Sequence, residues 1–468
     1  MKKASRNFLS LFVSDGITRI IGFAATIYIA RVLAVEGFGL INYGLAFISY
    51  ALLFANPGLT IIGTREVARA PHDRRLIEAT LGLRLVLGIL MFAVFFVGSI
   101  VIPGDITTKR VIIVYALTLF PFAVLLEFVF QGREEMGYIG AGRIIQYGIY
   151  LVVLLLFLRR VTDLLVVPLA FVISYLGNAA FLTAVFISKY GSFKFRFSLP
   201  QWRMMLSASV PVGLAIIFNH ATISLPPIVL GIFMTNYEVG VFSAGWKIVF
   251  VLLIIERVFY YVFFPILSRQ HKEHPEQLAG SFNLLIRLLF GLTIPIAVGG
   301  LILAPGIIVG VFGRSFLEAA GVLRILLPFF VIAPVNTVFG YGLIAIGQEK
   351  QFFRIISMTA LLSAIFIVLL GCRFGAQGAA AALFIGECVS FVLMSRELGK
   401  SVPLTILKHV PRPLIAGLAM AVVLFCLQQW HFIVLVIFGA AAYAILMFLL
   451  RGFSAQSIRN LYKAVAED

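Results

Sequence analysis

Long apolar stretches separated by short polar breaks run through the whole chain. Most of them last about 20 residues, which is the length of a membrane-spanning helix. A strand of a membrane barrel needs only about 9–11 alternating residues, so the run length favours helices. The pattern therefore predicts fourteen spanning helices, at residues 8–30, 39–59, 81–102, 111–131, 143–158, 164–187, 206–232, 241–264, 279–303, 321–346, 352–371, 377–395, 412–427 and 431–450.

The composition agrees with a chain that lies mostly within a membrane. Of its 468 residues, 61% are hydrophobic and 12% are charged, whereas soluble domains average about 45–50% and about 25%. The mean hydropathy is +1.07. These values exclude a soluble enzyme with one anchor and leave no room for a large extramembrane domain. The 45 phenylalanines, against 20 acidic residues, exclude a disordered chain.

The basic residues are distributed in a way that orients the chain. A net charge of +17 on a soluble protein would indicate nucleic acid, but in membrane proteins basic residues collect in cytoplasmic loops. With the N-terminus inside, the inside segments hold 24 of the 37 lysines and arginines and the outside segments hold 7. We therefore expect a multi-pass protein of the cytoplasmic membrane, with both termini cytoplasmic and no nucleic-acid partner. The first apolar run lacks a small-residue cleavage site, so we interpret it as an uncleaved span.

The two halves of the chain resemble each other weakly. Glu36-Gly-Phe-Gly39 follows the first span, and Glu238-Val-Gly240 follows the seventh, about 200 residues later. A second pair of segments, at residues 132–134 and 347–349, has a similar offset. Six spans separate the copies, so the halves run parallel, an architecture known from transporters. We predict one six-helix lobe over residues 1–200, a second over 201–400, and two extra helices with a cytoplasmic tail over 401–468.

Ionisable residues inside the predicted spans are the main candidates for function. Each costs at least about 2.5–3.5 kcal/mol at a lipid-exposed helix centre, so each is expected to face a protein interior or a water-filled cavity. The basic residues exceed the acidic ones by two. They are Arg19, Arg84, Lys247, Arg257, Arg287 and Arg324, against Asp15, Glu127, Glu256 and Glu387, with His220 as a further titratable group.

Several of these residues have structural alternatives to a role in ligand binding. Asp15 and Arg19 are four residues apart on one helix, so they form either a self-neutralising pair or part of a ligand site. Arg84 and Arg324 lie near the ends of their spans, which favours snorkelling to the interface. Glu127 could cap a helix or pair with Arg133.

The remaining candidates lie deeper in their spans. Glu387 could make an interhelical hydrogen bond or couple transport to an ion, and His220 is expected to be a structural hydrogen-bonding residue. Lys247 and Arg257 fall on one predicted helix about 15 Å apart, where they could form two rungs of a cationic track, and Glu256 could neutralise a neighbour. We expect Lys247, Arg257 and Arg287 to face a lumen.

The seventh predicted span is rich in residues that weaken a helix. It contains Pro211, Pro226 and Pro227, and proline removes a backbone hydrogen bond and kinks a helix. Interrupted helices mark the moving or binding parts of transporters. We therefore predict a hinge at these prolines, with a static kink as the alternative.

Motifs of the common enzymes are missing from the sequence. No Walker loop occurs, so ATP is not expected to be the direct energy source. No predicted outside loop exceeds about 20 residues or clusters the acid and base groups that a glycosyl polymerase would need. Cys372, Cys388 and Cys426 lie in or beside apolar runs, without disulfide or metal-ligand spacing. We expect neither an enzyme nor a bound metal or cofactor.

One segment resembles a known family. Arg19-Ile-Ile-Gly-Phe, Ala30-Arg-Val-Leu-Ala-Val-Glu-Gly-Phe-Gly, Asn56-Pro-Gly-Leu and Thr64-Arg-Glu-Val-Ala-Arg are similar to the polysaccharide (O-antigen) flippases of the multidrug/oligosaccharidyl-lipid/polysaccharide (MOP) exporter superfamily. The layout of spans fits over the whole chain, as does Gly375-Ala-Gln-Gly-Ala-Ala. The family often has an acid at the position of Asn56, and its absence would remove one candidate proton or sodium site.

The resemblance implies a flippase for an undecaprenyl-diphosphate-linked oligosaccharide. Two six-helix lobes would form a V around a cavity lined by spans 1, 2, 7 and 8, working by alternating access on a proton or sodium gradient. A diphosphate needs buried cations, and Arg19, Lys247 and Arg257 fall on those spans. Arg287 is on span 9, so its assignment is weaker. Asp15, Glu127 and Glu387 are then the candidates for ion coupling, and the polysaccharide-assembly machinery is the expected partner.

Three other functions compete with this interpretation. A multidrug cation antiporter of the same superfamily would need an anionic cavity, which the basic excess opposes. A peptidoglycan-precursor flippase would use the same chemistry on a different head group. A membrane glycosyl polymerase is the alternative from another class.

Overall fold

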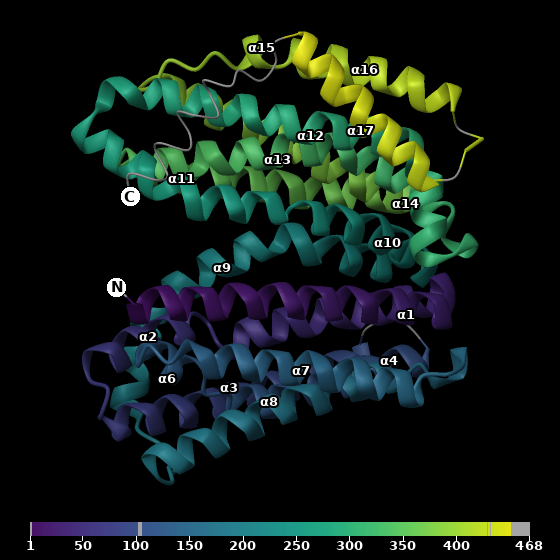
Figure 1. The fold of residues 1–468 in the computed structure, drawn as a ribbon. Coiled ribbons are helices and arrows are strands. Elements are labelled where there is room, and N and C mark those ends of the chain that lie inside the picture. Colours follow the sequence, from purple (N-terminus) through teal and green to yellow (C-terminus); the bar gives the residue numbers. More distant parts are fainter. Residues whose placement is uncertain (1, 102–104, 428, 431, 451–468) are drawn as a thin grey trace. The chain divides into compact units, whose positions relative to one another are not determined.

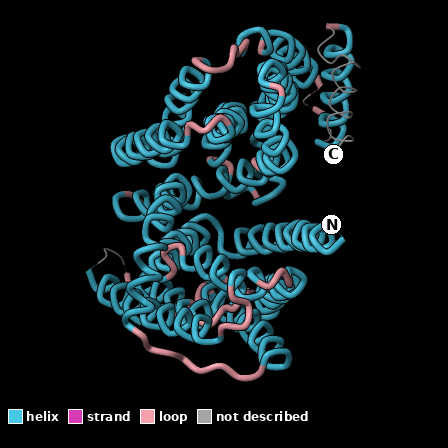
Figure 2. The backbone as a smooth tube through the Cα atoms, turned by 90° about the vertical axis from the view of Figure 1, so that its left-hand side faces the viewer, coloured by secondary structure: helices cyan, strands magenta, loops and turns pink. Residues whose placement is uncertain are grey.

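The computed structural model describes residues 2–101, 105–427, 429–430 and 432–450 (Figure 1). Within these ranges the regular elements are all helices, joined by short connections (Figure 2). Within the part of the chain that the structure describes, ten helical segments are long and apolar enough to cross a membrane, and two shorter apolar stretches are residues 224–233, at the end of a longer helix, and 434–449. The predicted all-α, polytopic membrane fold is confirmed.

Each of the fourteen predicted spans corresponds to helical structure. The first unit contains α1 (Lys2–Ala55), α2 (Leu59–Arg69), α3 (Arg74–Val101), α4 (Ile106–Ala116), α5 (Leu119–Ala123), α6 (Glu127–Gly132), α7 (Met136–Phe157), η1 (Val161–Asp163), α8 (Val166–Tyr190) and α9 (Leu199–Phe233). The chain continues with α10 (Asn236–Leu252), α11 (Ile254–Glu273), α12 (Pro275–Phe312), η2 (Arg314–Phe316), α13 (Ala319–Ala345), α14 (Glu349–Gly399), α15 (Ile406–His409), α16 (Pro411–Cys426) and α17 (Phe432–Leu449).

Two of these helices each hold a pair of predicted spans. At 1.5 Å per residue α1 would be about 80 Å long, far more than the roughly 30 Å of a hydrocarbon core. It is interrupted at Ala34, which has a φ of 55° and a ψ of −169°. The 51-residue α14 is interrupted in the same way at Gly375, with a φ of 60°. These breaks divide each helix where the sequence predicts a turn between spans.

Two predicted spans are less continuous than expected. Span 4 consists of three helices, α4, α5 and α6, and residues 124–126 between the last two are not helical. Span 8 was expected to be one helix, but α10 ends at Leu252 and α11 begins at Ile254. Lys247 and Arg257 therefore lie on different helices.

The chain divides into two compact units, Met1–Gly240 and Val241–Asp468. The core of the first includes Phe128, Phe130 and Phe186, on α6 and α8. The core of the second gathers side chains from α12, α13 and α14, among them Phe282 and Phe339. Helix α9, which the repeat assigns to the second half, packs mainly against α1 and α2 and so belongs to the first unit.

Candidate functional site

Two ion pairs formed by intramembrane residues lie in the first unit. On α1, Arg19 Nε donates to Asp15 Oδ2 over 2.9 Å, so the self-neutralising pair, one of the two alternatives for these residues, is present. On α7, Arg143 donates to both oxygens of the Glu127 carboxylate, over 3.2 Å to Oε1 and 2.9 Å to Oε2. This second pair joins α6 to α7.

The two pairs belong to one network. The Arg143 guanidinium lies within electrostatic reach of Asp15 as well as Glu127, and Tyr147, one turn further along α7, lies near all four charges. The side chains of Asp15 and Arg143 are 40% and 41% exposed. The network can therefore be reached by a solute, and Arg143 has a second carboxylate close to the one that it binds.

Arg143 was missed as a candidate because the fifth apolar run begins with it, so it was assigned to a loop. Helix α7 in fact begins at Met136, which places Arg143 about two turns inside the helix. The sequence offered Arg133 as a partner for Glu127, but Arg133 has other contacts. Its guanidinium donates to the carbonyl oxygen of Pro71 over 2.6 and 3.0 Å and lies 3.7 Å from the ring centre of Tyr190.

Arg84 does not snorkel to the interface, contrary to the prediction. It is 3% exposed and donates to the carbonyl oxygens of Leu125, over 2.8 Å, and Phe122, over 3.2 Å. Leu125 lies in the break between α5 and α6, where the helical hydrogen-bond pattern is interrupted, and Phe122 lies in the last turn of α5. Non-helical backbone at membrane depth is tolerated only where protein or water satisfies it. Arg84 satisfies it here, and Glu127 lies close enough to balance its charge.

The predicted cationic residues of span 8 and span 9 belong to the second unit. Lys247 is half-buried in the middle of α10, and within the described chain its ammonium makes no hydrogen bond or ion pair. The side chain of Arg257 lies outside the described residues. Arg287, on α12, is within electrostatic reach of His409, which also lies near Lys408 and Arg412.

The other predicted residues have mainly structural contacts. Glu387, on α14, accepts a hydrogen bond of 2.6 Å from Asn336 Nδ2, so the interhelical bond considered for it is present. Arg324 is exposed and donates to the Leu301 carbonyl over 3.1 Å. The ring of His220 lies edge-on to Tyr50, with 6.1 Å between the centroids.

Helix α9 runs unbroken through the predicted hinge. Pro211, Pro226 and Pro227 all lie inside it, so the hinge stays a prediction. Asn56, where the family often has an acid, occupies the break between α1 and α2. It accepts from the Thr60 amide over 3.1 Å and donates to the Thr60 hydroxyl over 2.8 Å, so it is bonded to the first turn of α2.

The glycines that mark the repeat meet each other inside the first unit. A Cβ atom on Gly39 would overlap the carbonyl oxygen of Asn236 and come within 2.8 Å of the Gly240 nitrogen. A Cβ atom on Gly240 would overlap the carbonyl oxygen of Val35. The matched glycines therefore let α1 and the first turn of α10 cross with their backbones in contact.

The second pair of repeated segments forms the same turn in both units. After α6, the Glu135 amide donates to the Phe130 carbonyl over 2.8 Å, and after α13 the Gln348 amide donates to the Leu343 carbonyl over 2.8 Å. The residue before each amide has positive φ, 58° at Glu134 and 78° at Gly347. This is the capping geometry of a Schellman turn, and its recurrence supports the internal repeat.

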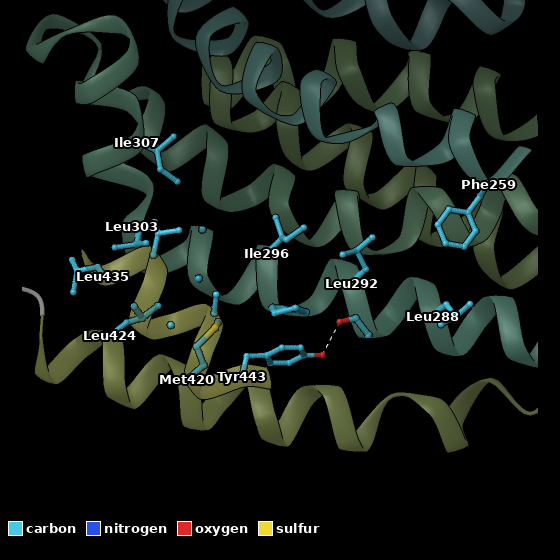
Figure 3. Close-up of a pocket in the computed structure, with 17 residues that line it drawn as sticks. Phe259, Leu288, Leu292, Ile296, Leu303, Ile307, Met420, Leu424, Leu435 and Tyr443 are labelled. Carbon is cyan, nitrogen blue, oxygen red and sulfur yellow. Dashed lines mark hydrogen bonds between the residues drawn. The ribbon is translucent and has the colours of Figure 1, made fainter. Parts of the chain in front are cut away.

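An apolar pocket of about 640 Å³ lies in the second unit, between α12 and the pair α16 and α17 (Figure 3). Its walls include Leu292, Ile296, Met420 and Leu424. The Tyr443 hydroxyl is already occupied, because it donates to the Gly291 carbonyl over 2.7 Å. The pocket therefore offers hydrocarbon contacts. The last two helices, which lie outside the repeat, form one of its walls.

Many apolar spans, charge pairs at span depth and an apolar pocket among the spans are features of a polytopic membrane transport protein. The comparisons with known proteins agree. The chain belongs to the family of polysaccharide biosynthesis proteins, whose model matches residues 4–271, more than half of the chain. This confirms the resemblance seen in the sequence.

Two curated relatives carry names that describe transport of glycans. A protein of Haloferax volcanii named as a low-salt glycan biosynthesis flippase, Agl15, is 25% identical over 246 residues, which are 51% of this chain and 52% of the relative. The match thus spans about half the length of that relative. A protein of Escherichia coli K12 named as an O-antigen transporter is 23% identical over 416 residues, covering 83% of this chain and 95% of the relative.

Solved structures show the same fold. The lipid II flippase MurJ, in an inward closed conformation, superposes with a TM-score of 0.79 at 12% identity, over 94% of this chain and 98% of that one. An inward-facing multidrug resistance MATE transporter superposes with a TM-score of 0.64 at 15% identity, over 82% of this chain and 95% of that one. At these identities the likeness shows the fold alone.

Proposed function

We propose that this protein flips a polyprenyl-diphosphate-linked oligosaccharide from the cytoplasmic to the outer leaflet of the cytoplasmic membrane. It works by alternating access, with both termini cytoplasmic, and delivers its substrate to the polysaccharide-assembly machinery. Undecaprenyl is the expected lipid. A proton or sodium gradient supplies the energy, so that no cofactor and no covalent chemistry on the substrate are required.

The apolar pocket is the observation that carries this proposal. Its 640 Å³ lie within the range of about 300–1,000 Å³ typical of small-molecule sites. Its walls are spanning helices, so the ligands that can reach it through the bilayer are hydrocarbon chains. A polyprenyl chain matches such a surface, whereas an amphipathic cationic drug would need a polar or acidic contact that the pocket does not offer.

The diphosphate of the proposed substrate needs cationic partners, and basic side chains could provide them. Lys247 is the best-placed candidate, because its ammonium is half-buried and not engaged by an acid in the described chain. Arg257 and Arg287 are proposed to extend the same binding. Arg19 joins them only if it leaves Asp15, to which it is bonded.

Ion coupling is proposed to act through the carboxylates Asp15, Glu127 and Glu387. Glu127 is the strongest of the three, because protonating it would remove the negative charge that pairs with Arg143 and weaken the two hydrogen bonds that hold its guanidinium. Arg143 would then be free to turn toward Asp15 or toward a phosphate. The prolines of α9 are proposed to bend as the protein changes conformation.

The proposal can be tested with the purified protein in liposomes and a fluorescent undecaprenyl-diphosphate oligosaccharide. Movement is followed by an impermeant reductant that quenches only the label on the outer leaflet. We expect Gly299→Leu, which places a side chain in the pocket against Met420, to slow flipping by about tenfold, the effect of about 1.4 kcal/mol. Gly310→Leu is the matched control, since it lies on the same helix with open space around it.

The same assay separates the competing functions. If Gly299→Leu flips the labelled lipid as fast as the wild type, the pocket does not hold the lipid chain. If Lys247→Gln is as fast as Lys247→Arg and the wild type, the ammonium does not bind the diphosphate. Transport of labelled lipid II in place of the oligosaccharide lipid would identify a peptidoglycan-precursor flippase, and transport of a cationic dye alone would identify a drug antiporter.

A further inference from the structure

An unusual sequence joins α8 to α9. Residues 193–197 read Phe-Lys-Phe-Arg-Phe, with aromatic and basic side chains in strict alternation. Residues 191–198 form no helix. We call this segment, which lies wholly within the first unit, the 191–198 loop.

The backbone of the 191–198 loop is fastened to the beginning of α3. The Lys194 amide donates to Glu78 Oε1 over 3.0 Å, and the Arg196 amide donates to the Glu78 carbonyl over 3.2 Å. Just after the loop, the Trp202 indole donates to the Ala79 carbonyl over 2.9 Å. These bonds use main-chain donors and the indole, so they leave the basic side chains available.

The side chains of the loop remain largely uncovered. Phe195 is 40% exposed, Phe197 is 64% exposed and Leu199, the first residue of α9, is 76% exposed. Lys194 and Arg196 are exposed as well. Because hydrogen bonds hold the backbone in place, the fold itself keeps these aromatic side chains at the surface.

The level of the loop in the membrane follows from the helices around it. It begins where the candidate span Val166–Tyr190 ends and lies against the first turns of the candidate span Arg74–Val101. It is therefore at the boundary between hydrocarbon and water. Phenylalanine and leucine side chains at that boundary insert into the edge of the acyl region, and lysine and arginine beside them attract anionic lipids.

We propose that the 191–198 loop is a binding site for the head groups of anionic phospholipids. Phe195, Phe197 and Leu199 insert at the edge of the hydrocarbon, and Lys194 and Arg196 contact the lipid phosphates. The charge pattern favours this ligand over a second copy of the chain, because the exposed groups at the loop itself are apolar or positive. The proposal does not depend on the substrate of the protein.

Trp202 provides a reporter next to this site, since its ring lies 5.7 Å from that of Phe197. The full chain with Trp246→Phe and Trp430→Phe keeps Trp202 as its single tryptophan. It is placed in bilayers of phosphatidylcholine with a minority of phosphatidylglycerol, and bromine is attached to the chains of one lipid or the other. We expect brominated phosphatidylglycerol to account for a far larger fraction of the quenching of Trp202 than its mole fraction in the bilayer.

Removing the two cations should abolish this preference. Lys194→Gln with Arg196→Gln is expected to lower the relative affinity for phosphatidylglycerol by roughly fivefold for each charge. The matched control, Lys109→Gln with Arg110→Gln, removes the same charge near the opposite end of α3 and should leave the quenching of Trp202 unchanged. An unchanged melting temperature shows that the variants remain folded.

Three results would overturn the proposal. The first is equal quenching of the wild type by the two brominated lipids, and the second is a preference that survives in the Lys194→Gln, Arg196→Gln variant. The third is quenching that follows the protein-to-lipid ratio rather than the head group, which would indicate a contact between copies. Raising the salt from about 0.1 M to about 1 M shortens the screening length from about 10 Å to about 3 Å, so a preference that resists this change also contradicts the assignment.

Discussion

Replacing Arg84 by methionine tests whether one buried arginine holds the broken span together. The guanidinium donates to the carbonyl oxygens of Leu125 and Phe122 and lies 5.0 Å from the ring centre of Phe122. Methionine retains much of the side-chain volume and removes the donors. The Leu125 carbonyl would then lose its donor, whereas the Phe122 carbonyl would keep its bond from the Leu125 amide.

The magnitude follows from these contacts. A hydrogen bond from a charged group contributes about 1.5–3 kcal/mol in soluble proteins, but hydrogen bonds between membrane helices average about 0.6 kcal/mol, with a maximum of about 1.7. Two bonds and a cation–π contact of about 1 kcal/mol give a loss of about 2–4 kcal/mol. Relief of the desolvation of Arg84 acts in the opposite direction, so the lower half of this range is expected.

The free energy of unfolding can be measured by denaturant titration of the protein in mixed micelles, followed by tryptophan fluorescence. Arg84→Lys should lose about half as much as Arg84→Met, because an ammonium cannot fork between two carbonyls as a guanidinium does. Arg324→Met is the control, since Arg324 is exposed and donates to one carbonyl. If Arg84→Met costs no more than Arg324→Met, Arg84 does not stabilise the break between α5 and α6.

Two further predictions concern the backbone of the first unit. Gly39→Val should prevent the crossing of α1 and α10 and abolish the monodisperse peak in size-exclusion chromatography, whereas Gly16→Val, with nothing near its Cβ position, should not. At the start of η1, the amides of Arg159 and Arg160 donate to Asp163 and hold the pKa of its carboxyl below the usual 3.8. The stabilisation is therefore present above pH 3.8 and is lost as the pH falls through the lowered pKa. The protection factor of the Arg160 amide against hydrogen exchange should fall there, and Asp163→Asn should remove this pH dependence of the protection.

The lengths of the apolar runs were sufficient to predict the spans and the turns inside α1 and α14, but not the interruptions within spans 4 and 8. Each predicted run corresponds to helical structure because burial in hydrocarbon decides the helix, whatever partner it packs against. The break at Ala34 lies between the predicted spans 8–30 and 39–59, although no glycine or proline stands at that position. The break between α5 and α6 depends on Arg84, which lies on another helix about 40 residues earlier. Such interruptions come from tertiary contacts, and a single sequence does not display them.

The residues of the candidate site also fall into those that the sequence could predict and those that it could not. The pair of Asp15 and Arg19 was predictable, because spacing along one helix fixes it. The pair of Glu127 and Arg143 was not, since the two residues lie on different helices separated by a turn. Arg84 was misjudged for a related reason: nearness to a span end indicates snorkelling only when no buried carbonyl competes for the guanidinium.

The charges of the first unit form a network that is poorly explained by stability alone. Replacing buried ion pairs by apolar side chains is often neutral or stabilising, and in the bilayer each ionised group adds a further cost. A network of this kind is useful where partners must change. Arg143 is bonded to Glu127 and lies close to Asp15, so exchanging one carboxylate for the other keeps the number of pairs constant while α1 and α7 shift. We infer that the low cost of this exchange, rather than the strength of either pair, is what the protein requires of these residues in the transport cycle proposed for it.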